Sequence, residues 1–187
     1  MSERTIIADA ERTTDLFVGV LAKAMASRVL EEEFDGQVTM AQLQALRYLS
    51  RNDQRLMSDL AEGLGISYPA ATKTVERLVK KELVSREGDP ADRRVVRVRL
   101  TDAGARMVER IGAEMNRRLG AVLEHLHEAD REALLRGMSA FVSAALENIE
   151  DEKTLTSICL HCGDQHIGDC PVEEARVRLV EQQGSTV

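Results

Sequence analysis

The sequence predicts a mainly α-helical protein that carries one small β-hairpin. Apolar residues recur at intervals of three or four over long stretches of the 187-residue chain, which is the period of an amphipathic helix. Aromatic residues make up only 3% of the chain, so the expected core consists of Leu, Val, Ala, Ile and Met. The period changes to two within residues 86–100, where three apolar residues alternate with Arg97 and Arg99.

Two helices are expected before the centre of the chain. One apolar stripe predicts the first over residues 9–34, and this helix ends in the acidic run 31–33 before Gly36. Thr39 is placed to cap the second helix. The inward positions of that helix are Met40, Leu43, Leu46, Tyr48 and Leu49.

Two shorter helices joined by a sharp turn are expected next. Gly63 and Gly65 supply the turn, and Ser67 is placed to cap the helix that follows it. Pro69 lies in the first turn of this helix, where a missing N–H costs nothing. The expected inner stripe of the helix is Ala71, Val75, Leu78 and Val79.

The outer face of this helix suits the major groove of DNA. Small, hydroxyl and basic side chains near a helix N-terminus match the donors, acceptors and thymine methyls that the groove presents. Glu76 would either read a cytosine amino group or pair with Lys80. An ordinary solvated helix face is the alternative. The candidate DNA contacts are Ser67, Tyr68, Pro69, Thr72, Lys73 and Arg77.

The hairpin adds a second candidate contact with DNA. Residues 88–90 (Gly-Asp-Pro) mark the break between its strands, and Asp92, Arg93 and Arg94 form its tip. A basic tip beside a reading helix suits the minor groove, whose negative potential attracts Arg. Residues 39–104 are therefore expected to form a winged helix-turn-helix unit that binds double-stranded DNA.

Long helices follow the hairpin. Thr101 is placed to cap the first, which is expected to be about 38 Å long, and another begins near Ala129. The first and last helices carry more apolar surface than a small winged domain covers, and a symmetric dimer on a palindromic DNA site would bury it. Residues 1–38 and 105–150 are therefore expected to be dimerisation segments. Packing of these stripes within one chain is the alternative.

Charge is distributed unevenly along the chain. The net charge of −7 argues against DNA binding, because neutralisation of phosphates supplies most non-specific affinity. Residues 51–100, however, hold eleven Lys or Arg against eight Asp or Glu, a local excess of +3. Basic charge is concentrated where the groove contacts are expected, and we expect modest non-specific binding.

A sequence signature spans the hairpin and the start of the next helix. The run from Asp92 to Gly104 fits Asp-x-Arg-x3-Val-x-Leu-Thr-x2-Gly and resembles the wing signature of the MarR family of bacterial transcription regulators. The resemblance extends over residues 9–150 and implies that Arg94 enters the minor groove, that Asp92 holds it in position, and that residues 67–77 meet the major groove. It also implies pairing through the N- and C-terminal helices, with a small, often aromatic effector bound between these helices and the DNA-binding unit.

Residues 151–187 lie outside this resemblance and contain a candidate metal-binding motif. Cys159, Cys162, His166 and Cys170 fall within twelve residues and can close a tetrahedral shell, while the glycines between them allow tight turns. Zinc is the expected metal, because it favours closed sites of three Cys and one His. An iron–sulfur cluster and copper(I) are alternatives. His161 is a competing ligand, and three free thiols in a disordered tail are the remaining interpretation.

These features predict a regulator of transcription and not an enzyme. No motif places a nucleophile near a base and an orienting acid, and the sequence has no Gly-rich phosphate loop. We expect a homodimeric repressor controlled by a small ligand or by the metal or redox state of the tail. The alternatives are a metal or iron–sulfur redox sensor whose tail is the effector site and, less favoured, a metalloenzyme on a winged scaffold. A charged N-terminus and the lack of a long apolar segment predict a cytoplasmic protein without a membrane anchor.

Overall fold

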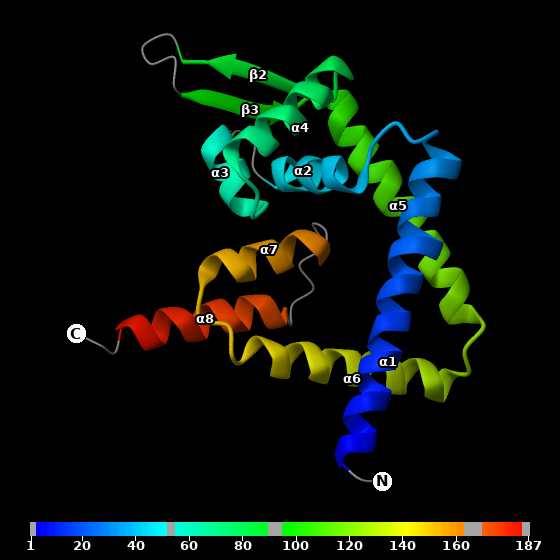
Figure 1. Ribbon diagram of the computed structural model, residues 1–187. Helices are drawn as coiled ribbons and strands as arrows, with labels where there is room; N and C mark the ends of the chain where they lie inside the picture. The colour runs from blue at the N-terminus through cyan, green and yellow to red at the C-terminus, as the bar shows by residue number, and fades with distance from the viewer. Residues whose placement is uncertain (1–2, 52–54, 90–94, 163–169, 185–187) are drawn as a thin grey trace.

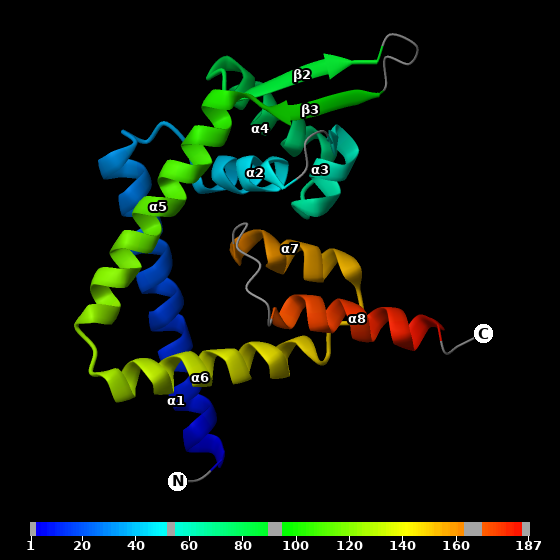
Figure 2. The same cartoon turned by 180° about the vertical axis from the view of Figure 1, so that it is seen from behind.

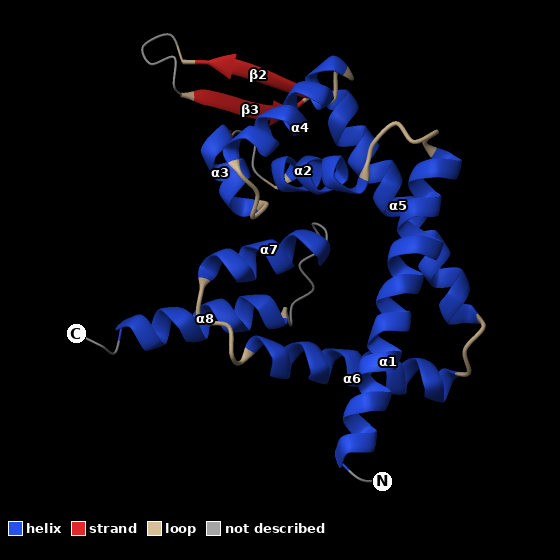
Figure 3. Cartoon of the chain, in the orientation of Figure 1, coloured by secondary structure: helices blue, strands red, loops and turns tan. Residues whose placement is uncertain are grey.

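The computed structural model describes residues 3–51, 55–89, 95–162 and 170–184, and it confirms a mainly helical fold with a small antiparallel sheet (Figure 1). Figure 3 shows how little of the chain is strand. Among the described helices, none combines the length and the apolar character needed to cross a membrane. In chain order the elements are α1 (Glu3–Gly19), η1 (Val20–Ser27), η2 (Val29–Glu33), α2 (Met40–Ser50), β1 (Arg55–Leu56), α3 (Met57–Gly63), α4 (Tyr68–Lys80), β2 (Val84–Gly88), β3 (Val96–Leu100), α5 (Asp102–Glu124), α6 (Glu128–Leu146), α7 (Glu152–Cys162) and α8 (Pro171–Gly184).

The first helix begins earlier than predicted and changes its winding. It starts at Glu3, and its later part, η1 and η2, is wound as π-helix. The apolar stripe divides in the same way, since Leu16 in α1 is exposed whereas Val29 and Leu30 in η2 are buried. Only the later half of the stripe therefore packs into the described part of its own chain.

A third strand, which the sequence did not predict, completes the sheet. The strand order is β1-β3-β2, with both pairs antiparallel. Arg55 lies opposite Val98, and Val84 lies opposite Leu100. Because β1 is two residues long, it is too short to show an alternating pattern. The helical spacing of Leu56, Leu60 and Leu64 predicts that Leu56 belongs to a helix, but it lies in this strand.

Three predicted helix caps are confirmed. Thr39 forms a capping box with Gln42 at the start of α2, and the Ser67 hydroxyl accepts a 3.4 Å hydrogen bond from the Ala70 amide. Thr101 Oγ1 accepts from the Gly104 amide at 3.0 Å. Gly65 adopts a φ of +63° in the turn between α3 and α4, a conformation that glycine adopts without strain.

The described residues form two separate apolar cores. The larger one gathers buried side chains of η2, α2, α3, α4, the sheet and the first half of α5. The smaller one joins the end of α6 to α7 and α8 through Leu146, Leu155, Cys159, Val172, Ala175 and Leu179. The apolar positions within residues 172–181 predict a last short helix, which α8 confirms, whereas α7 was not expected. Cys159 and Cys162 lie in this helix, where the sequence suggested tight turns.

The backbone at the start of α5 lies very close to the residue that precedes β2. The Thr101 amide donates to the Leu83 carbonyl at 3.1 Å, and the Thr101 hydroxyl donates to the Glu82 carbonyl at 2.7 Å. A Cβ atom on Gly104 would lie 2.0 Å from the same Leu83 oxygen. Glycine is therefore needed at this position, which gives a physical reason for the Thr-x2-Gly ending of the signature.

Gly104→Ala is expected to lower the free energy of unfolding by about 1–3 kcal/mol, because the added methyl group collides with backbone that cannot move aside. Gly112→Ala is the matched control on the same helix, since a Cβ there would meet no atom within 4 Å. The control should leave stability unchanged or raise it by up to about 1 kcal/mol. Denaturant unfolding of both variants measures the difference, and equal midpoints would contradict the close approach.

Candidate nucleic-acid interface

Helix α4 presents most of the predicted major-groove residues on one exposed face. Its opposite face is fixed by Ala71, Val75 and Leu78, which are fully buried against the larger core. Val79, expected on the inner stripe, is exposed at the edge of that stripe. The predicted contacts Ser67, Tyr68, Pro69, Lys73 and Arg77 are exposed, and Thr72 is half-buried.

The hydroxyl of Thr72 already donates its proton in a hydrogen bond within α4. It donates to the Tyr68 carbonyl at 2.9 Å, one turn earlier in α4. The oxygen lone pairs of Thr72 remain able to accept from a base amino group, and its methyl group suits thymine. Thr72 therefore offers an acceptor and an apolar contact, and not a donor.

The cations of α4 differ in whether they are engaged. Within the described part of the chain, Lys73 and Arg77 form no ion pair, so both remain available to phosphate or bases. Lys81, just beyond the helix, donates to the Gln37 carbonyl and, at 2.9 Å, to the Gln42 amide oxygen. Lys81 thus has a structural task, tying the end of α4 to the start of α2.

The one acidic side chain of α4, Glu76, was expected to read cytosine or to pair with Lys80. Both side chains are exposed, and no ion pair joins them among the residues that the structure describes. The carboxylate of Glu76 therefore stays available on the same face as Lys73 and Arg77.

The outward cations of the wing strands are largely paired. Arg99 lies 3.1 Å from the Glu87 carboxylate and donates to the Ser85 hydroxyl at 3.0 Å. Arg97 lies 3.7 Å from the Asp89 carboxylate. These cross-strand pairs hold β2 against β3 and leave little net charge on that face. The predicted tip residues Asp92, Arg93 and Arg94 lie outside the described residues.

Arg86 on β2 is a candidate contact that the sequence reasoning missed. Its side chain is exposed, and it forms no ion pair within residues 3–51, 55–89, 95–162 and 170–184. Counting charges along the sequence does not separate a free arginine from a paired one. The strand register does, because it places Arg97 and Arg99 across from Glu87 and Ser85, and Arg86 across from Val98.

A cluster of ion pairs fastens α5 to the end of the first helix. Arg118 lies 2.8 Å from Glu114, 3.0 Å from Glu32 and 3.3 Å from Glu33. Hydrogen bonds from Arg117 and Arg118 lower the pKa of Glu114 to about 2, so its carboxylate is ionised at neutral pH. The guanidinium of Arg110 also lies 5.0 Å from the centre of the Phe34 ring. These contacts join the first helix to α5, the two long helices that flank the DNA-binding unit in the sequence.

The structure places two of the four predicted metal ligands with their side chains. Cys159 is buried in the smaller core, and Cys170 packs against that core immediately before α8. The side chain of Cys162 and all of His166 lie outside the described residues. Within the described part, no group of three or more His, Cys, Asp or Glu side chains is arranged to hold a metal ion.

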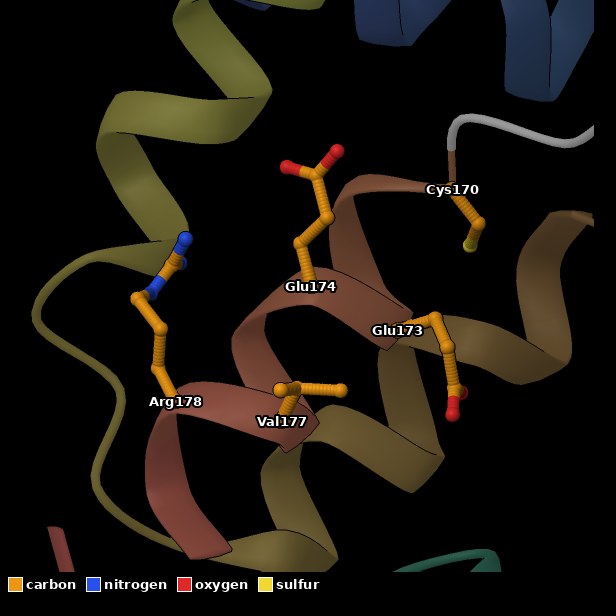
Figure 4. A pocket seen from close by; sticks show the side chains of 5 residues that line it. All are labelled: Cys170, Glu173, Glu174, Val177 and Arg178. Atoms are coloured by element: carbon orange, nitrogen blue, oxygen red, sulfur yellow. The ribbon is translucent and has the colours of Figure 1, made fainter. Parts of the chain in front are cut away.

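A shallow cavity of about 390 Å³ lies beside the first turns of α8. Figure 4 shows that its lining side chains point in different directions and do not converge on a common centre. The lining residues are Cys170, Glu173, Glu174, Val177 and Arg178.

Comparison with known proteins agrees with this arrangement. The sequence model of the MarR family matches residues 37–95. The chain is 31% identical over 113 residues to the HTH-type transcriptional regulator YdgJ of Bacillus subtilis (strain 168), a match that covers 60% of this chain and 68% of that protein. It is 28% identical over 152 residues to the HTH-type transcriptional regulator YfiV of the same organism, covering 81% of this chain and 94% of that protein.

A solved structure gives the same result. A MarR family protein from Bacillus stearothermophilus superposes with a TM-score of 0.63 at 25% identity, and the match covers 75% of this chain and 95% of that chain. The family match and the relatives define the class as DNA-binding transcriptional regulators. The chain belongs to the MarR family of winged helix-turn-helix transcriptional regulators.

Proposed function

We propose that the protein is a homodimeric repressor that binds a palindromic operator through α4 and the wing. The exposed face of α4 carries this proposal, because it offers two unpaired cations, a hydroxyl acceptor and an aromatic ring near a helix N-terminus. Ser67, Tyr68, Pro69, Thr72, Lys73 and Arg77 would meet the major groove. In the wing, Arg94 would enter the minor groove with Asp92 positioning it and Arg93 beside it.

Exposed apolar side chains on the long helices support the homodimer. Leu16 on α1 and Phe141 on α6 are each 65% exposed, and Ile7 and Leu135 are exposed as well. Apolar side chains at this density mark an interaction surface, and a second copy of the same helices would cover them. Residues 1–38 and 105–150 are thus our proposed dimerisation segments around the DNA-binding unit at 39–104.

A change in the angle between that unit and the long helices would release the operator, since both half-sites must be met together. At this junction Arg47 of α2 donates to Met115 Sδ of α5 at 3.5 Å, and buried side chains of η2 pack into the core of the unit. A small effector bound between the dimer helices and the DNA-binding unit, as the family resemblance implies, would act there.

Arg94→Ala is expected to weaken operator binding by about 1–3 kcal/mol, because a minor-groove arginine is lost. Arg178→Ala removes the same charge from α8, far along the chain from the wing, and should leave affinity unchanged. Titration of an operator fragment selected from random duplexes measures both variants. Equal affinity of Arg94→Ala and wild type, with an intact circular dichroism spectrum, would remove Arg94 from the interface.

A second proposal concerns metal binding by the tail, residues 151–187. We propose that Cys159, Cys162, His166 and Cys170 hold one zinc ion per chain. The support is that Cys159, near the end of α7, and Cys170, directly before α8, pack against one small core. The helical hairpin therefore brings two of the four ligands to the same region. An iron–sulfur cluster at the same residues, making the protein a redox sensor, is the alternative.

Metal content per chain, measured after purification without chelator, tests this proposal. Wild type should carry one zinc and be colourless, whereas Cys162→Ser and His166→Gln should lose most of it. His127→Gln, a histidine change outside the tail, is the matched control, and His161→Gln tests the competing ligand. A brown, iron-containing protein would favour the cluster, and metal-free wild type with three titratable thiols would end the proposal.

A further inference from the structure

We infer that the α7–α8 hairpin is a brace that docks on α2 and α3 and holds the DNA-binding unit at a set angle to the long helices. Its effect on operator choice rests on the DNA binding proposed above, whereas the docking itself does not. Figures 1 and 2 show the hairpin returning from the end of α6 to lie beside α2 and α3. The unit, which is covalently continuous with η2 and α5, is therefore also held non-covalently through α7.

The hairpin is built as a stiff extension of α6. Leu155 and Cys159, one turn apart on α7, are buried against Val172 and Ala175 of α8. Leu146, the last residue of α6, belongs to the same core. Because one set of packed side chains joins the three helices, a movement of α6 is carried into α7.

The interface between α7 and the DNA-binding unit is polar. Glu152, Lys153 and Thr156 of α7 line a cavity of about 220 Å³ together with Tyr48 of α2 and, from α3, Asp59, Glu62 and Gly63. The two apolar cores on either side of this cavity do not merge. Docking therefore lacks the apolar burial that would make it permanent.

Two polar contacts cross this interface between residues that the structure describes. Lys153 Nζ lies 2.9 Å from the Glu62 carboxylate, and the Arg51 guanidinium, at the end of α2, donates to Cys159 Sγ at 3.1 Å. The two α7 residues are six positions apart, so the contacts are spaced about 9 Å along the helix. Two separated contacts resist rotation as well as translation, which is what a brace requires.

The docked hairpin leaves the reading surface open. In the DNA-binding unit α7 packs mainly on α2 and α3, and α4 packs on the same two helices. The hairpin therefore acts on the orientation of α4 and does not block DNA. Its contacts are also weak, since the side chains of Lys153 and Glu62 are 73% and 57% exposed. Weak polar docking can be released by salt or by a change at the tail.

Part of this chain has no counterpart in a solved relative. The match to the Bacillus stearothermophilus protein covers 95% of that chain but only 75% of this one. The tail is the segment that the sequence resemblance leaves out. Control of the unit from this side would accordingly distinguish this chain from relatives that lack such a segment.

Two variants of the Lys153–Glu62 pair test the docking: one reverses a single charge, and the other swaps both charges. In Lys153→Glu, the new carboxylate would face Glu62, Asp59 and Glu152, so the hairpin should undock and the amides of α7 should exchange with deuterium several-fold faster. The double variant Lys153→Glu with Glu62→Lys swaps the two charges and should restore slow deuterium exchange of the α7 amides. Arg136→Glu, which disturbs a pair inside α6, is the control. Unchanged exchange in Lys153→Glu, or no recovery in the double variant, would overturn the docking.

The effect on orientation is tested with DNA. Wild type should discriminate between its selected operator and the same operator lengthened by two base pairs between half-sites. Undocking in Lys153→Glu should reduce this ratio of affinities several-fold, with recovery in the double variant. If the α7 amides exchange faster with deuterium but the ratio of operator affinities is unchanged, the hairpin does not set the orientation of the unit, and the proposed DNA binding is unaffected. Failure of wild type to select any operator would instead refute the proposed function.

Discussion

The backbone contact between Gly104 and the Leu83 carbonyl fixes the direction in which α5 leaves the wing. A side chain at position 104 would occupy the space of that oxygen, and Thr101 bonds the same turn to the carbonyls of Leu83 and Glu82. The reading helix α4 ends three residues before Leu83. One short stretch of backbone thus links the reading helix, the sheet and the long helix, so any tilt of α5 reaches α4.

Charge pairing decides which cations of this acidic chain remain available for DNA. On the wing strands, Arg99 pairs with Glu87 and Arg97 pairs with Asp89. Lys81 donates to Gln42 and so links α4 to α2. Lys73, Arg77 and Arg86 remain unpaired in the described part of the chain. With few free cations, the surface favours specific groove contacts over strong non-specific attraction to phosphate.

The sequence predicted the helices that have a clear apolar stripe. It also predicted their caps, because Thr39, Ser67 and Thr101 each accept a hydrogen bond from an amide only three residues along the chain. It missed β1, whose two residues are too few to show a period, and α7, where the cysteines suggested a metal loop. The sequence also could not predict the docking of α7 on α2 and α3, because contacts such as that of Arg51 with Cys159 join residues far apart in the chain. The sequence could not single out Arg86 either, because only the strand register distinguishes it from the paired arginines of the wing.

In the proposed function, the long helices and the reading unit act together in a dimer on a palindromic site. The most direct test is the molar mass of the complex with a selected operator, measured by light scattering on the full chain. Two chains per duplex, on a site whose halves are centred one helical turn apart, is the predicted result. One chain per duplex, or binding without sequence preference, would contradict the account.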